Sequence, residues 1–289
     1  MAADPSPSSP DVLVFGASGA VGRFLVPLLA GRFRLVSVSR SPPAEPGWLA
    51  ANLDDARFPW PQTSIAVSLG PLDAFAAWLE RNAATDGLRR VVALSSMSIE
   101  SKNDSLDPAE RALAARLADA EARIFGVAAE HGIAATLFRP TLIYGAGSDR
   151  SLAPIARFAQ RWRVLPVPLG ATGLRQPVHA ADLAAACAAV LDNPATFGNT
   201  YPLGGGERLR FDALIRRIGA ALRGPIFTPP LPVAALAFAA SLSVRVPRAA
   251  IRRLRQDLIA DNAAAARDFA YAPRAFRAAD VLPETPVYK

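Results

Sequence analysis

Three glycines near the start of the chain have the spacing of a turn that binds a diphosphate. Gly16, Gly19 and Gly22 form the pattern G-x-x-G-x-x-G between an apolar run and an amphipathic stretch. Glycines at such positions permit a tight turn, a close approach of the backbone to pyrophosphate oxygens, and close packing of helix on strand. The free N–H groups of the following helix then face the phosphates. The pattern therefore predicts a dinucleotide site.

The end of the second apolar run indicates which dinucleotide fits. A carboxylate at this place would bind the ribose hydroxyls of NAD. The run ends instead in Ser39 and Arg40. Because a guanidinium is suited to a 2′-phosphate, the sequence favours NADP(H), with NAD(H) as the alternative.

Hydride chemistry at a hydroxyl or carbonyl carbon also needs a group that moves a proton. Ser96, Ser98 and Lys102 follow the fourth apolar run, at the end of a strand where such sheets bind ligands. Burial beside a cofactor would lower the pKa of Lys102 enough for acid–base work. Tyr144 is the fourth candidate. The plainer interpretations are a solvated loop lysine and a tyrosine that serves packing alone.

Three other side chains have weaker claims to a function. His179 precedes a predicted helix, where it is either a substrate contact or a capping group. His131 is followed by glycine, which is a plain signal for the end of a helix. Cys187 lies in an alanine-rich run and is expected in the core.

These residues lie on a series of apolar runs that alternate with helical segments. The runs are DVLVFGASG, FRLVSVSR, TSIAVSLG, LRRVVALSS and IAATLFRP. Strands that are apolar on both faces are covered on both, which predicts an α/β fold of the Rossmann type, with a doubly wound parallel sheet. Asp107 is expected to cap a helix that begins at Pro108 and ends at His131.

The chain length leaves room for one large domain. We expect residues 1–10 to be a short disordered lead and residues 11–289 to form a single NAD(P)-binding Rossmann domain. A smaller C-terminal substrate-binding lobe would come mainly from 145–180 and 204–289. One of its helices is expected near 248–268.

Composition excludes several classes of protein. With 51% hydrophobic and 20% charged residues, the chain is neither disordered nor fibrous. One cysteine permits no internal disulfide, and two histidines with one cysteine cannot form a zinc site of the usual type. No apolar stretch is long enough for a spanning helix, and the lead does not resemble a signal peptide. We therefore expect a cytoplasmic protein without a bound metal.

The net charge of +7 is concentrated in the C-terminal third, where residues 207–289 hold 14 basic and 7 acidic residues. No finger, helix-turn-helix or aromatic–basic stripe accompanies this charge, so no nucleic-acid binding is expected. Residues 229–259 join an uncharged stretch to an arginine-rich one. This arrangement predicts either a lid over a small-molecule substrate or a contact with a membrane surface.

Seven motifs resemble, in order, those of the extended short-chain dehydrogenase/reductase superfamily, which contains nucleotide-sugar epimerases and dehydratases. They are GASGAVG, NLDD, VALSS, RPTLIYG, PVHAADLAAA, YPLGGGERLRFDAL and DNAAAARDFAYAPRAF. The resemblance spans nearly the whole chain. It implies an NAD(P)-dependent enzyme that transfers a hydride on a nucleotide sugar or a related hydroxyl or ketone substrate. Members of this superfamily often form homodimers through helices that flank the sheet.

The resemblance also implies which residues touch the cofactor. Asn52 stands where the family has an aspartate that holds adenine, and Arg139–Gly145 resembles a motif that borders nicotinamide and substrate. The predicted cofactor-binding residues are Gly16, Ala17, Ser18, Gly19, Ala20, Val21, Gly22, Ser39, Arg40, Asn52, Leu53, Ser68, Leu69, Gly70, Ser95, Arg139 and Pro140. The predicted catalytic residues are Ser96, Ser98, Lys102 and Tyr144.

The acid–base pair of the family, Tyr-x-x-x-Lys, is missing, because no tyrosine of this chain has a lysine four residues later. If Glu121 matches the glutamate that follows the pair, the two positions hold Leu113 and Leu117. Met97 stands in place of the catalytic serine or threonine. A non-catalytic NADP(H)-binding sensor or scaffold is therefore the alternative function. Glu121 lies three helical turns beyond Glu110, and both are expected on one solvated face.

Overall fold

The computed structural model describes most of the chain, namely residues 12–84, 87–149, 151–234 and 252–282. The predicted lead at 1–10 lies outside the described residues. So do residues 235–251 of the apolar–basic segment predicted at 229–259.

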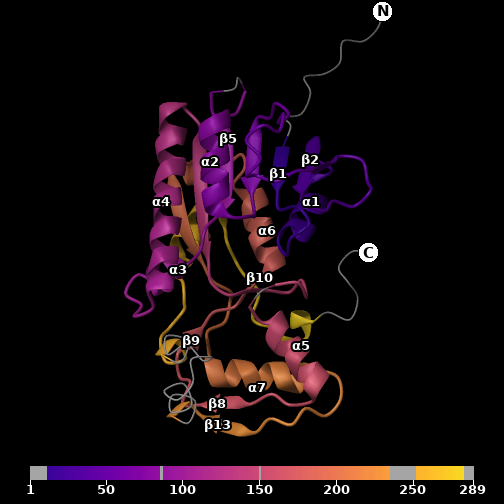
Figure 1. Ribbon diagram of the computed structural model, residues 1–289, viewed down its shortest axis with the longest axis vertical. Helices are drawn as coiled ribbons and strands as arrows, with labels where there is room; N and C mark the ends of the chain where they lie inside the picture. Colours follow the sequence, from indigo (N-terminus) through magenta and orange to yellow (C-terminus); the bar gives the residue numbers. More distant parts are fainter. Residues whose placement is uncertain (1–11, 85–86, 150, 235–251, 283–289) are drawn as a thin grey trace, which may run out of the picture. The chain divides into compact units, whose positions relative to one another are not determined.

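A seven-stranded sheet, in the order β11-β6-β5-β4-β1-β2-β3, dominates the first part of the described chain (Figure 1). Its strands are β1 Val12–Phe15, β2 Leu35–Ser39, β3 Trp48–Ala50, β4 Ile65–Ser68, β5 Arg90–Leu94, β6 Ala134–Pro140 and β11 Asn199–Leu203. Neighbouring strands from β3 to β6 pair in parallel. The predicted α/β fold with a doubly wound parallel sheet is confirmed.

Helices and short strand pairs make up the rest of the described structure. The helices are α1 Gly22–Leu29, α2 Leu72–Asn82, α3 Ser98–Ser101, α4 Pro108–Glu130, α5 Ala153–Trp162, α6 Ala180–Ala189, α7 Phe211–Ala221 and α10 Ala263–Phe269, with 3₁₀ turns η1 Pro194–Thr196 and η2 Ala278–Val281. The short strands are β7 Ile143–Tyr144, β8 Val167–Leu169, β9 Leu174–Arg175, β10 Val178–His179, β12 Leu209–Arg210 and β13 Pro230–Pro232. β7 pairs with β10, β9 with β12, and β8 with β13.

The start of α4 confirms a local signal in the sequence. Asp107 accepts a hydrogen bond from the Ala109 N–H at 2.9 Å, and Pro108 is the first helical residue. The side chain satisfies one of the free N–H groups at the helix start, and the proline has none to lose.

The chain divides into two compact units. The first consists of Met1–Ser95, Leu117–Phe138 and Ala184–Thr200. The second consists of Ser96–Arg116, Arg139–Leu183 and Tyr201–Lys289. Each unit has its own apolar core.

The core of the first unit lies between the sheet and the helices α2 and α4. Phe15 of β1 contacts Trp78 of α2, with ring centroids 4.8 Å apart, and Ile124 of α4 belongs to the same cluster. The intervening strand residues Val12 and Val14 are also fully buried. Both faces of the sheet are therefore covered, as parallel strands require.

The core of the second unit forms around α5, α7 and the short strand β8 (Figure 1). Leu214 and Ile218 of α7 pack in one cluster with Ala156 and Ala159 of α5. The alanines give α5 a narrow buried side. Its larger side chains must therefore lie elsewhere on the helix surface.

The helix predicted at 248–268 is wrong for much of its described length, because α10 begins only at Ala263. The Leu258 N–H donates to the Leu174 carbonyl at 2.8 Å, so the chain here follows β9. The Arg175 guanidinium also holds the carbonyls of Gln256 and Arg253. These long-range bonds outweigh the helical preference of an arginine- and alanine-rich stretch.

A buried arginine ties together several chain segments of the first unit. Arg90 of β5 is only 4% exposed. Its guanidinium donates to the carbonyls of Val190 at 2.8 Å, Leu191 at 3.2 Å and Ala134 at 3.0 Å, and to the Thr136 hydroxyl at 2.7 Å. Several buried acceptors therefore depend on a single charged donor group.

We predict that Arg90→Met lowers the free energy of unfolding by about 2–4 kcal/mol, since buried acceptors lose a charged donor. Urea unfolding followed by circular dichroism measures the change. Arg89→Met is the control, because this neighbouring side chain is exposed. Equal losses in the two variants would contradict the role assigned to Arg90.

Candidate functional site

The first glycine turn lies directly against the end of β4. Gly16 has a φ of +74°, a left-handed conformation that side chains strain. A Cβ on Gly16 would lie 3.2 Å from the Leu69 carbonyl carbon and 3.3 Å from the Gly70 nitrogen. Glycine is thus required here both by the turn and by the neighbouring backbone.

The next two glycines set the start of α1 on the same turn. A Cβ on Gly22 would come within 2.3 Å of the Ala17 carbonyl oxygen, so only glycine permits this close packing. Gly19 is exposed on the outside of the turn. In the described structure no side chain caps the start of α1 at Val21, and the N–H groups of Arg23 and Phe24 donate to the backbone carbonyls of Gly19 at 3.2 Å and Val21 at 3.0 Å. The helix start therefore carries no side chain that would compete with an external anion. These features fit a dinucleotide pyrophosphate.

The end of β2 is attached to the glycine turn. The hydroxyls of Ser18 and Ser39 lie 2.8 Å apart, and the Ala17 N–H donates to the Val38 carbonyl at 3.3 Å. The Arg40 side chain is exposed and forms no ion pair with any described residue. A cation is therefore available at the end of β2, where a ribose would lie in a dinucleotide site.

Further predicted residues lie at or just beyond the ends of β3 and β4. Leu53 is buried, and a Cβ on Gly70 would lie 3.9 Å from the Leu53 Cδ1. The Ser68 hydroxyl is buried and has no hydrogen-bond partner among the described residues. Asn52 is exposed, and its side chain accepts a hydrogen bond from the Asp54 N–H at 3.4 Å.

The sheet register explains why these residues gather. Phe15 pairs with both Val38 and Ser68, and Ser68 pairs with Ala93. The carboxyl ends of β2, β1, β4 and β5 therefore lie in a row, at the edge where parallel sheets bind ligands. The first unit places there the predicted residues Gly16, Ala17, Ser18, Gly19, Ala20, Val21, Gly22, Ser39, Arg40, Ser68, Leu69, Gly70 and Ser95.

A glutamate that the sequence placed in solvent contacts this edge. Glu121 of α4 is only 6% exposed, and the Ser95 hydroxyl donates to it at 2.5 Å. Glu110 is also partly covered, since it binds the Ser105 hydroxyl and pairs with Arg253. The predicted solvated face is therefore wrong. Burial of Glu121 could have been read from its place three residues before Ile124, on the apolar side of α4.

Three predicted catalytic residues lie around α3 in the second unit. The Ser96 hydroxyl accepts the Ser98 N–H at 3.0 Å, which fixes the start of the helix. Lys102 closes the helix, with its N–H bonded to the Ser98 carbonyl at 3.1 Å. Partial burial and then the nearby Arg253 lower the pKa of Lys102, against the opposite effect of Asp107.

The residues Arg139 and Pro140 are linked to the same helix. An Arg139 guanidinium nitrogen lies 3.0 Å from a Glu100 carboxylate oxygen. The Pro140 carbonyl accepts the Met97 N–H at 3.1 Å. The structure therefore joins these two predicted cofactor residues to α3.

The fourth predicted catalytic residue, Tyr144, is fully buried. Its hydroxyl accepts the Arg277 N–H at 3.2 Å, and its ring packs against Phe276. Burial, opposed by this hydrogen bond, raises the pKa of Tyr144. Its surroundings favour the interpretation that it serves packing.

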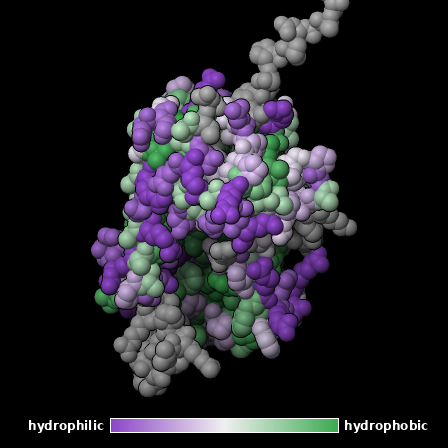
Figure 2. Space-filling view, turned by 45° about the horizontal axis from the view of Figure 1, so that its top comes forward, coloured by the Kyte–Doolittle hydropathy of each residue, from purple (hydrophilic) through white to green (hydrophobic). Residues whose placement is uncertain are grey.

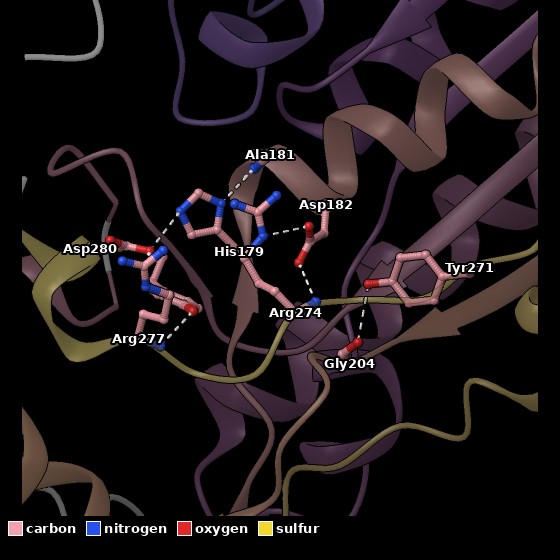
Figure 3. Close-up of polar contacts among 9 residues, drawn as sticks. His179, Ala181, Asp182, Gly204, Tyr271, Arg274, Arg277 and Asp280 are labelled. Atoms are coloured by element: carbon pink, nitrogen blue, oxygen red, sulfur yellow. Dashed lines mark hydrogen bonds and ion pairs between the residues drawn. The ribbon is translucent and has the colours of Figure 1, made fainter.

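Tyr144 packs edge-on against His179, with ring centroids 5.1 Å apart. His179 belongs to a polar cluster with Asp182, Arg274 and Asp280 (Figure 3). The His179 Nδ1 accepts the Ala181 N–H at 3.1 Å, and its Nε2 lies 3.8 Å from the Asp280 carboxylate. Asp182 accepts from the Arg274 backbone N–H at 3.1 Å and from its Nε at 2.8 Å. The capping interpretation of His179 therefore holds for the start of α6.

A cleft of about 900 Å³ lies within the second unit, between residues 100–110 and residues 252–257. It is lined by Glu100, Ser101, Asp104, Ser105, Leu106, Asp107, Pro108, Glu110, Arg252, Arg253, Gln256 and Asp257. The cleft is lined by both acidic and basic side chains. Two of these, Arg253 and Asp107, interact electrostatically with Lys102.

The described residues contain neither a metal-binding cluster nor a membrane-spanning helix. No group of three or more His, Cys, Asp or Glu side chains in that part of the chain could hold a metal ion. No helix found there has the length and apolar character to cross a membrane. Cys187 is buried as predicted, and burial raises the pKa of its thiol to about 12.

The fold is of the Rossmann type, and the glycine turn lies where such folds bind dinucleotides. Residues 76–204 match the model of the NAD dependent epimerase/dehydratase family. The matched residues make up a little less than half of the chain, and they support the resemblance predicted from the sequence.

Solved structures share the fold over nearly the whole chain. MoeE5 in complex with UDP-glucuronic acid and NAD is 18% identical, with a TM-score of 0.72 over 96% of this chain and 97% of that one. UDP-glucuronic acid 4-epimerase from Bacillus cereus, in complex with UDP-glucuronic acid and NAD, is 13% identical, with a TM-score of 0.71 over 96% and 98%. A short-chain dehydrogenase/reductase superfamily protein from Agrobacterium tumefaciens with bound NAD is 18% identical, with a TM-score of 0.68 over 95% of each chain.

A curated relative resembles a shorter part of the chain. Subunit 9 of the mitochondrial NADH dehydrogenase [ubiquinone] 1 alpha subcomplex from Arabidopsis thaliana is 42% identical over 72 residues. The match covers 25% of this chain and 18% of that protein, so it spans less than a fifth of the relative's length.

We predict that Gly19→Leu weakens NADPH binding about tenfold or more, because the side chain would occupy the outer surface of the phosphate turn. Isothermal titration calorimetry measures the affinity, and thermal unfolding checks the fold. Gly31→Leu is the matched control, since a Cβ there meets nothing within 4 Å. Unchanged affinity in Gly19→Leu would remove the turn from the binding site.

A second prediction concerns acid stability. Burial, then Arg274 and Arg277, lower the pKa of His179 below its usual value, despite Asp182 and Asp280. The unfolded chain therefore takes up the proton first, at about pH 6.5. The stability that neutral His179 contributes is complete above that pH and is lost as pH falls through the lower pKa of the folded state.

Urea unfolding between about pH 8 and pH 5 measures this dependence. We expect His179→Gln to lose stability less steeply on acidification than the unsubstituted chain. His131→Gln, which removes the exposed histidine after α4, should keep the original slope. Identical slopes in His179→Gln and the unsubstituted chain would contradict the prediction.

Proposed function

We propose that the protein is an NAD(P)-dependent oxidoreductase or epimerase that binds its dinucleotide at the first glycine turn. The observation that carries this proposal is the geometry of the turn. Gly16 and Gly22 allow the backbone contacts that place the uncapped start of α1 at the ligand-binding edge of the sheet. NADP(H) is the favoured cofactor, because exposed Arg40 follows the Ser18–Ser39 contact at the end of β2.

The substrate is a nucleotide sugar or a related molecule with a hydroxyl or ketone group. The epimerase/dehydratase family match supports this class, and two of the similar structures are described as complexes with UDP-glucuronic acid. The lobe expected from 145–180 and 204–289 would hold it. The mixed charge of the cleft near Arg252 and Arg253 is compatible with a polar substrate.

Proton transfer is assigned to Lys102, with Ser98 beside it on α3. A bound nicotinamide would accept or supply the hydride. Partial burial lowers the pKa of Lys102, which brings its ammonium closer to the range useful for a general acid. The Ser96 hydroxyl positions α3 through the Ser98 N–H. Tyr144 packs against His179 and Phe276 and takes no part in the chemistry.

A second function is favoured by a separate observation. No tyrosine of this chain has a lysine four residues later, and the match of Glu121 to the family's glutamate would put Leu113 and Leu117 at the positions of the pair. Tyr144 is fully buried. A chain with this turn and without this pair can bind NADP(H) as a sensor or as a scaffold subunit. The short match to a NADH dehydrogenase subunit from Arabidopsis thaliana is compatible with such a role.

The deciding experiment combines binding with turnover. We expect NADPH to bind the purified chain with one-to-one stoichiometry and more tightly than NADH. Incubation with sugar nucleotides and ketones should then give products, which chromatography must detect because an epimerase regenerates its cofactor. Lys102→Met should lower turnover about 100-fold or more while NADPH affinity stays within about threefold.

Lys289→Met, at the other lysine of the chain, is the matched control and should retain turnover. Tight binding without any product across the panel would favour the non-catalytic function. Absence of binding by either dinucleotide would overturn both functions. Full turnover in Lys102→Met would mean that the chain is an enzyme but that Lys102 does not transfer the proton.

A further inference from the structure

Large aromatic side chains of the second unit are exposed on one side of α5. Phe158 is 49% exposed and Trp162, four residues later, is 61% exposed. Residues four apart lie on the same side of a helix, so the two rings are neighbours. The buried alanines Ala156 and Ala159 occupy the other side.

A third exposed ring lies beside the end of the same helix. Phe227 is 67% exposed. Its N–H donates to the Arg163 carbonyl at 2.9 Å, and its carbonyl accepts the Leu165 N–H at 2.8 Å. Figure 1 shows the α7–β13 loop, which contains Phe227, next to the end of α5. Phe227 therefore pairs through its backbone with the residues that directly follow Trp162.

We call Phe158, Trp162 and Phe227, with the arginines around them, the aromatic–basic face. The Arg161 guanidinium lies over the Trp162 ring, 5.5 Å from its centroid. Arg163 is also exposed and donates to the Arg223 carbonyl. The Arg161 cation is therefore held over a ring of this face, and the Arg163 side chain is bonded to the loop that contains Phe227.

The two segments that build this face contain no carboxylate. Residues 151–181 and 213–256 together contain twelve arginines and no aspartate or glutamate. Single exposed apolar residues are ordinary, and Figure 2 shows many of them among hydrophilic ones. Phe158, Trp162 and Phe227 differ from such isolated residues, because they are three large exposed rings in segments that carry only positive charge.

We propose that the aromatic–basic face docks the protein on the surface of an anionic lipid bilayer. Aromatic rings are stabilised at the boundary between acyl chains and headgroups. Arginines beside them are attracted to lipid phosphates and to the negative surface potential. The aromatic–basic face supplies both the rings and the positive charge. Its residues lie outside the segment 229–259 for which the sequence predicted a membrane contact.

A second copy of the chain fits this face less well. A symmetric dimer contact brings the same patch together twice, so Arg161 and Arg223 would meet arginines of the other copy. No carboxylate of these segments is present to compensate them. An anionic lipid surface has the complementary charge, and the face needs no deep groove to meet it.

The test is binding of the full chain to large unilamellar vesicles, measured by flotation. One set contains phosphatidylcholine only, and the other contains about 30% phosphatidylglycerol. We expect binding to the anionic vesicles alone, and weaker binding as salt rises from about 50 mM, because screening reduces the attraction. Trp162→Ser with Phe227→Ser, and separately Arg161→Glu, should each reduce binding about tenfold.

The first unit offers matched controls. Leu28→Ser removes an apolar side chain that is 48% exposed on α1, and Arg57→Glu makes the same charge change at another exposed arginine. Both should bind vesicles like the unsubstituted chain. NADPH affinity should be unchanged in every variant, which verifies the fold and separates this proposal from the proposed function.

Several results would overturn the proposal. These are failure of the unsubstituted chain to bind anionic vesicles, equal binding to both vesicle types, or equal effects of face and control variants. Light scattering after size-exclusion chromatography gives one more. If Trp162→Ser with Phe227→Ser converts a dimer into monomers, the face is an interface between two copies instead.

Discussion

The close contact between the first glycine turn and the end of β4 is the constraint on which the proposed site depends. Gly16 adopts a left-handed conformation against the Leu69 and Gly70 backbone, where a Cβ would lie within 3.3 Å of both. Gly22 permits a similar approach of α1 to Ala17. Because parallel strands end at the same edge, these two contacts bring one helix start to the place where the strand ends converge.

Local signals allowed much of the first unit to be predicted. The apolar runs, the glycine spacing and the cap at Asp107 act within a few residues, so sequence periodicity reports them directly. Burial of Glu121 depends instead on Ser95, which lies 26 residues away. The extended path at Leu258 depends on Leu174 and Arg175, which precede it by some 80 positions. The place of Glu121 on the apolar side of α4 is visible in the sequence, but the partner Ser95 and the path at Leu258 leave no periodic signal.

The environment of each polar group separates residues that the sequence could not rank. The sequence offered both Lys102 and Tyr144 as candidates, since each side chain can transfer a proton. Partial burial lowers the pKa of Lys102 and favours its neutral amine, whereas burial raises the pKa of Tyr144 and favours its neutral phenol. The phenol also accepts a backbone hydrogen bond from Arg277. A phenol held in this way stabilises the local packing and is poorly suited to proton transfer.

Binding and chemistry are assigned to different units of this chain. The glycine turn and the residues at its edge of the sheet belong to the first unit, whereas Ser96, Ser98, Lys102 and Tyr144 belong to the second. Substitutions around α3 and α4 can therefore remove a proton-transfer pair without disturbing the contacts of Gly16. Retention of the turn alone is thus an argument for dinucleotide binding, and turnover has to be argued from α3. The same separation means that the aromatic–basic face, which lies in the second unit, can act whether or not the chain is an enzyme.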